Sequence, residues 1–162
     1  MIIKEVYGKI IKDSRKDQTI EVTIKTNVGK FSASAPNGKS KGKNEAKPYI
    51  KSIQKDVESL GKLSDYFSEE HIEKFSDLRR IEDIVKGHIG ANTLFAFESA
   101  VLKAVSKEQK KEIWQLINPD AKKIPRIVGN SAEGGMHSLS TKKPDFQEFL
   151  LIPNGESSIK LA

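Results

Sequence analysis

Three side chains with the chemistry of an active site stand in two polar, glycine-containing stretches of this sequence. Ser40 lies within Ala35–Ala46, a run of small, polar and basic residues near the start. His137 follows the glycine pair Gly134–Gly135, and Glu148 stands in an apolar run near the end. A hydroxyl, an imidazole and a carboxylate can together bind an anionic substrate and exchange protons with it. The sequence therefore suggests one side of an active site.

Each of these side chains also has an ordinary explanation. Ser40 is a loop serine, and most such serines only bind water or cap a turn. His137, after two glycines, fits an exposed turn. A lone carboxylate such as Glu148 is costly to bury unpaired, so it is either functional or on the solvent side of an edge strand. We read the charges of Lys39 and Lys41 as solvated.

The elements that would position these residues begin with strands. Residues 20–25 alternate apolar and polar side chains, which is the period of a half-buried strand. Apolar residues also recur over residues 3–11 and alternate over residues 31–35, and residues 27–29 are typical of a hairpin turn. We therefore expect a three-stranded antiparallel meander, followed by a flexible loop over residues 36–42.

Helical periodicity replaces the strand pattern after this loop. Helices are expected over residues 50–60, 72–85 and 91–105, and Gly61 and Gly87 are expected to end the first two. A short fourth helix with Ile113, Trp114 and Ile117 is expected to begin with a capping box of Ser106 and Gln109. Extended segments are then expected at residues 124–128 and 146–152. Strands first and helices next indicate an α+β fold: a meander, a helical bundle and a C-terminal pair of extended strands.

Composition limits the function only broadly. The chain of 162 residues can bury a core, its net charge is +6, and it has no cysteine, which excludes disulfide and thiolate chemistry. Its lysines are mixed with acidic residues, without the aromatic residues of a base-stacking surface, so no nucleic-acid partner is expected. There is no apolar signal region, and no apolar run approaches the roughly 20 residues of a membrane helix. We expect a cytoplasmic protein without membrane contact.

Five motifs, in order along the chain, resemble the N-terminal capping domain of the enolase family. They are Asp13–Arg15 with Thr19–Val22, Pro36–Gly42 with Glu45–Ala46, Gly90–Asn92, Gly134–His137, and Asp145–Phe149 with Pro153–Gly155. The resemblance covers essentially the whole chain. It implies an enolase N-terminal-like capping domain over residues 1–123 and the first two strands of an incomplete barrel over residues 124–162.

The resemblance also implies roles for the chemically capable side chains. Ser40 would close over the substrate and help to hold a second Mg²⁺ ion. His137 would contact the substrate near its phosphoryl group. Glu148, with Gln147 beside it, would join the acid network around the departing hydroxyl. The implied reaction is the magnesium-dependent dehydration of 2-phosphoglycerate, a small phosphorylated acid, to phosphoenolpyruvate in glycolysis.

Departures from the family pattern stand against a simple transfer of that activity. Lys16–Gln18 replaces Gly-Asn-Pro, Asn37 replaces a serine, Lys39 and Lys41 replace small residues, and Ser131–Glu133 interrupts the approach to the glycine pair. The family's magnesium carboxylates and its lysine base have no counterpart up to Ala162. We therefore expect no turnover from this chain alone, and activity only with a complementary barrel polypeptide. The alternative is a catalytically dead binding or regulatory module; self-association through unpaired strands is compatible with both.

Overall fold

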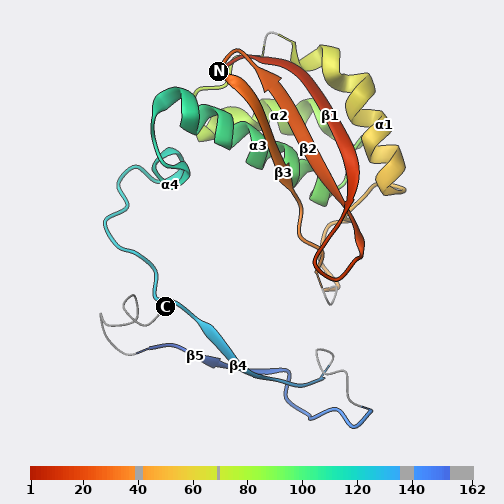
Figure 1. Ribbon diagram of the computed structural model, residues 1–162, viewed down its shortest axis with the longest axis vertical. Coiled ribbons are helices and arrows are strands. Elements are labelled where there is room, and N and C mark those ends of the chain that lie inside the picture. Colours follow the sequence, from red (N-terminus) through yellow and green to blue (C-terminus); the bar gives the residue numbers. More distant parts are fainter. Residues whose placement is uncertain (39–41, 69, 136–140, 154–162) are drawn as a thin grey trace. The chain divides into compact units, whose positions relative to one another are not determined.

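The computed structural model describes residues 1–38, 42–68, 70–135 and 141–153 (Figure 1). The chain divides into two compact units, a larger one of residues 1–37 with 44–120 and a smaller one of residues 38–43 with 121–162. The larger unit has a three-stranded antiparallel sheet followed by helices, and the smaller has a two-stranded sheet. These elements confirm the predicted α+β class.

The sheet of the larger unit is the predicted meander. Its strands are β1 (Ile3–Lys12), β2 (Gln18–Thr26) and β3 (Gly29–Ser34), paired in the order β1-β2-β3. Val22 lies opposite Gly8 on one side and Ala33 on the other. Val22 is fully buried, as its place in the alternating pattern predicted. The apolar face of the sheet is therefore the one that the helices cover.

Helices pack on one face of this sheet (Figure 1). They are α1 (Ile53–Leu63), the 3₁₀ helices η1 (Ser64–Phe67) and η2 (Phe75–Asp77), α2 (Leu78–Val85), α3 (Ala91–Gln109) and α4 (Ile113–Ile117). α1 contacts β1, and α3 contacts β2 and β3. At the centre of the core the rings of Phe67 and Phe97 meet edge to face, with centroids 4.9 Å apart. None of the helices in the described part of the chain is long and apolar enough to cross a membrane.

Two expected helix boundaries are wrong. Gly61 does not end α1, which continues to Leu63. Ser106 and Gln109 do not cap the short fourth helix, because both lie inside α3. The capping box of α4 is instead Glu112 with Gln115. Ser106 has another use, since its hydroxyl donates a hydrogen bond of 2.5 Å to the carbonyl of Lys111 and helps to close the end of α3.

The helix expected over residues 72–85 begins later than predicted. The carboxylate of Asp77 accepts hydrogen bonds from the amides of Glu73 and Lys74, at 2.9 and 3.0 Å. These amide bonds hold the pKa of Asp77 below its ordinary value. Asp77 therefore caps the start of the helical segment, since Lys74 is the N-cap of η2, which runs directly into α2. Only residues from Leu78 onward form α2.

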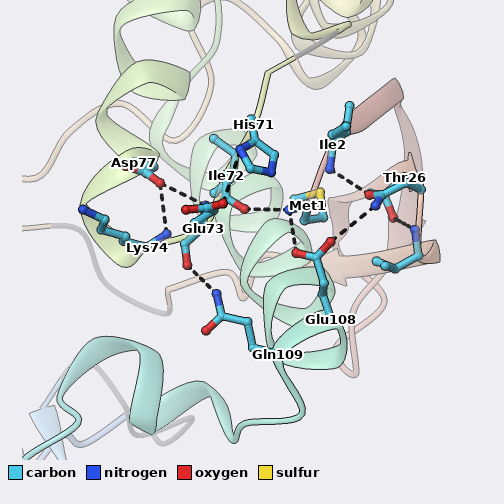
Figure 2. Close-up of polar contacts among 12 residues, drawn as sticks. Met1, Ile2, Thr26, His71, Ile72, Glu73, Lys74, Asp77, Glu108 and Gln109 are labelled. Carbon is cyan, nitrogen blue, oxygen red and sulfur yellow. Dashed lines mark hydrogen bonds and ion pairs between the residues drawn. The ribbon is translucent and has the colours of Figure 1, made fainter.

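A buried ammonium group joins the start of the sheet to the end of α3 (Figure 2). Met1 is fully buried, and its amino group donates to the carbonyl of Ile72 at 3.0 Å and pairs with the Glu108 carboxylate at 2.5 Å. Glu108 also accepts from the side-chain amide of Asn27 at 3.3 Å. The hydrogen bond from the ammonium group holds the pKa of Glu108 below its ordinary value. A buried charge requires such partners, because unpaired burial is costly.

A second buried charge, Asp56, links α1 to α3. Its side chain is fully buried and accepts three hydrogen bonds, from the amide of Ile50 at 3.2 Å, the amide of Gly90 at 2.7 Å and the hydroxyl of Thr93 at 2.6 Å. Gly90 and Thr93 lie at the N-terminus of α3, where free amides favour a negative charge. One carboxylate therefore fixes the start of α3 and the chain that leads into α1.

We predict that Asp56→Ala destabilises the protein by on the order of 3 kcal/mol, because three buried donors lose their acceptor. The free energy of unfolding, measured by urea denaturation, tests this. Asp83→Ala on the exposed side of α2 is the matched control, and it should change stability by less than about 0.5 kcal/mol. Equal effects of the two substitutions would show that Asp56 does not hold these elements together.

A half-buried carboxyl group lies between α2 and α3. Burial, together with the neighbouring carboxylate of Glu82, raises the pKa of Glu98 to about 7. The folded protein therefore keeps this proton well above pH 4.5, the ordinary value at which the carboxyl of an unfolded chain loses it. Between these two pH values the folded state binds more protons, so the contribution of Glu98 to stability falls as pH rises.

We predict that Glu98→Gln makes the protein more stable relative to the wild type at neutral pH than at about pH 5, because the amide cannot be forced to ionise. Urea midpoints measured across this pH range test the prediction. Asp83→Asn removes an exposed carboxyl on α2 and serves as the control, with no such pH dependence. Parallel stability profiles of Glu98→Gln and the wild type would contradict the assignment.

Candidate functional site

The structure describes two of the four predicted site residues. Ser40 and His137 lie outside the described residues. Gln147 and Glu148 lie in the smaller unit, at the start of strand β5 (Glu148–Leu151), which pairs with β4 (Gly129–Glu133). Glu148 is exposed, so it carries no cost of unpaired burial. The roles predicted for these four residues stay predictions.

The chain that enters the predicted loop is anchored at Asn37. Its side-chain amide donates to the Asp13 carboxylate and to the carbonyl of Gln18, both at 3.1 Å. Its own carbonyl accepts from the guanidinium of Arg15 at 2.8 Å. Asn37 therefore connects the loop to the turn between β1 and β2. Sequence reasoning treated Asn37 only as a departure from a family pattern and missed this role.

Asp13 is the centre of that connection. One of its carboxylate oxygens accepts from the amides of Arg15 and Asp17, each at 2.9 Å. Desolvation pushes the pKa of Asp13 upward, but the hydrogen bonds from Asn37 and the two amides outweigh it, so the pKa lies below its ordinary value. The carboxylate therefore stays ionised and keeps the turn and the loop entrance joined at neutral pH. This gives the Asp13–Arg15 motif a structural purpose.

The chain that leaves the predicted loop is anchored at the N-terminus of α3. The amides of Ala91 and Asn92 donate to the carbonyls of Lys47 and Pro48, at 2.9 and 3.0 Å. A side chain on Gly90 could not be accommodated, because a Cβ atom there would lie 2.3 Å from the Cα of Tyr49. The motif Gly90–Asn92 is therefore a docking point: the glycine allows close approach, and the free amides of the helix start provide the bonds.

The hairpin of the smaller unit closes through the predicted glycine pair. The amide of Gly134 donates to the carbonyl of Gln147 at 2.7 Å, and the amide of Gly135 donates to that of Pro144 at 3.1 Å. A Cβ atom on Gly134 would lie 2.3 Å from the carbonyl oxygen of Phe146, and Gly135 has a φ of +49°. Both positions therefore favour glycine. Residues 124–128, expected as a short strand or an extended linker, are not paired as a strand, since pairing begins only at Gly129.

Two further polar residues share the hairpin with Glu148. Glu133 lies directly opposite Glu148 in the antiparallel register. The side-chain amide of Asn130 donates to Glu133 at 3.1 Å and to Glu148 at 3.3 Å. Sequence reasoning did not select Asn130, because its proximity to Glu148 depends on the pairing of the two strands.

The described residues do not offer a complete magnesium site. Across residues 1–38, 42–68, 70–135 and 141–153, no group of three or more His, Cys, Asp or Glu side chains could hold a metal ion. Mg²⁺ prefers about six oxygen ligands, usually with carboxylates among them. The pKa values of Lys9 and Lys25 are raised by their bonds to Glu21 and Glu5, which is the wrong direction for a general base.

Comparison with known proteins identifies the relatives of this chain. It is 33% identical to an enolase of Methanosphaera stadtmanae over 98% of its length, 30% identical to an enolase of Methanothermobacter thermautotrophicus over 98%, and 29% identical to an enolase of Pyrococcus furiosus over 97%. The chain is a relative of the enolases. It spans 40% of the length of these enolases, and its α+β fold agrees with an enolase N-terminal domain. No model of a known protein family matches it.

We predict that Gly134→Ala opens the hairpin of this enolase relative, because the added methyl group collides with the carbonyl of Phe146. The amide of residue 134 should exchange with solvent about fivefold faster, as expected for the loss of roughly 1 kcal/mol of hydrogen bonding. Amide exchange followed by NMR tests this. Gly129→Ala in the same hairpin is the matched control, since an added Cβ meets nothing within 4 Å. Unchanged exchange in Gly134→Ala would contradict the contact.

Proposed function

We propose that the chain is the cap-side portion of an enolase-type dehydratase that converts 2-phosphoglycerate to phosphoenolpyruvate. The observation that carries the proposal is similarity to three enolases over almost the whole chain. The motifs that resemble the family also have defined structural positions at the loop entrance, the loop exit and the hairpin. The glycine pair holds the chain before Glu148 through the bonds from Gly134 to Gln147 and from Gly135 to Pro144.

The proposed reaction requires more than this chain provides. Removing a proton next to a carboxylate is unfavourable, and enolase-superfamily sites use a lysine or histidine base with magnesium that stabilises the ene-diolate. Among the described residues no cluster of possible metal ligands is found, and the pKa values of Lys9 and Lys25 are raised, which is the wrong direction for a base. We therefore propose that a complementary barrel polypeptide contributes the base and the metal carboxylates, and that the isolated chain does not turn over substrate.

Within a completed site, the residues of this chain would act on the leaving-group side. Glu148 would donate a proton to the departing hydroxyl, with Gln147 holding the same region. His137 would bind the phosphoryl group, and Ser40 would close over the substrate and help to hold a second Mg²⁺ ion. The exposed position of Glu148 supports this assignment, because a carboxylate must reach the substrate to act on it.

The smaller unit supports the proposal of a partner. Phe149, Leu150 and Leu151 of β5 are 57%, 55% and 61% exposed, although they are large apolar residues. β4 and β5 form a sheet of only two strands, so each has an edge without a neighbouring strand within the described residues. Exposed strand edges and apolar surfaces are typical of segments that pair with another sheet. A barrel would cover both.

We predict that mixing the chain with the remaining, C-terminal 60% or so of Methanosphaera stadtmanae enolase restores magnesium-dependent formation of phosphoenolpyruvate. Each polypeptide alone should be inactive, and Glu148→Gln in the mixture should lower kcat by at least about a hundredfold. The product formed from 2-phosphoglycerate is the measurement.

The same mixture distinguishes the dehydratase proposal from the alternative, a catalytically dead binding module. Size-exclusion chromatography reports association independently of turnover. Association without activity would favour the catalytically dead binding module, and a chain that neither binds the barrel nor 2-phosphoglycerate would refute the dehydratase proposal. Association of the chain with itself, measured without the barrel, would show that the apolar strands pair between copies.

A further inference from the structure

The strand before the glycine pair contains a bulge. Asn130 pairs with Leu150 and Ala132 pairs with Phe149, so Ser131 has no partner of its own. In a regular strand, residues three positions apart point to opposite faces, because the side-chain period is two. The extra residue shifts this alternation. Asn130 and Glu133 consequently share one face of the hairpin, which a regular strand would not allow.

Glu148 also lies on that face. It is directly opposite Glu133, and like charges in such cross-strand pairs repel. The side-chain amide of Asn130 has two N–H donors, and it donates to both carboxylates, at 3.1 Å to Glu133 and 3.3 Å to Glu148. The opposite orientation of the amide would place its oxygen against two negatively charged groups. The local charge therefore dictates which end of Asn130 faces Glu148.

We infer that Asn130 is a positioning residue for Glu148, brought onto the same face by the bulge at Ser131. This inference rests on the proposed function, in which Glu148 acts on the departing hydroxyl. Asn130 holds the carboxylate in one orientation despite the repulsion from Glu133. The bulge at Ser131 thus lets the side-chain amide of Asn130 bridge the carboxylates of Glu133 and Glu148.

The contact can be tested without turnover, in the full chain, through the side-chain amide signals of Asn130 in ¹H–¹⁵N NMR spectra. Glu148→Gln and Glu133→Gln should each shift these signals, because each removes a charged acceptor. Asp145→Asn, an exposed carboxyl on the approach to β5, is the control and should leave them in place. Signals that neither glutamate substitution moves would overturn the inference.

The functional consequence is tested in the mixture with the barrel polypeptide. Asn130→Ala should lower kcat by about ten- to hundredfold and change KM by less than about threefold, because it misplaces an acid without removing a binding group. The control is Asn118→Ala, which replaces an asparagine at the end of α4. If the wild-type mixture is inactive, the proposed function fails while the NMR result still decides the contact. If the wild-type mixture is active and the Asn130→Ala mixture has the same kcat, the positioning role is refuted.

Discussion

The arrangement of the larger unit depends on one buried carboxylate. Asp56 has no exposed surface, and a charge in that position is tolerable only because three donors satisfy it. Two of the donors belong to Gly90 and Thr93 at the start of α3, the helix that covers β2 and β3. Since Asp56 itself is part of α1, which covers β1, the same bonds set the two covering helices relative to each other. Packing of apolar side chains alone would leave their register less defined, because apolar contacts are non-directional.

The position of Gly90, which Asp56 fixes, also determines how the chain that leaves the predicted loop is held. Once Gly90 is fixed, the next two amides of α3 are in place to bind the carbonyls of Lys47 and Pro48. On the other side, Asn37 is fixed by Asp13 and Arg15. The chain is therefore anchored at residue 37 and again at residues 47–48, by polar contacts that lie at element ends. Polar anchors of this kind let a rigid scaffold present a variable segment, which is how many functional loops are organised.

The sequence could predict what depends on local pattern. Alternation identified β2, and helical spacing identified the core of α1 to α3, whereas the close approaches at Gly90 and Gly134 were found only in the structure. The sequence could not predict contacts between side chains and distant backbone. Asp77 caps the helical segment that begins at Phe75, and Ser106 helps to close the end of α3, both through hydrogen bonds between a side chain and the backbone. For the same reason Glu148 could be selected as a candidate acid, whereas Asn130 could not.

Departures from a family pattern are better judged by what they do locally than by counting them. Lys16, where enolases are expected to carry glycine, has a φ of +67°, a conformation that costs a side-chain-bearing residue about 1 kcal/mol. The Asp13 carboxylate binds the amides on both sides of Lys16 and so keeps the turn in spite of that cost. Asn37, in place of a serine, joins the same network, and the bulge at Ser131 brings Asn130 to the face of Glu148. Lys16 and Asn37 are therefore matched by polar contacts within the turn that they share.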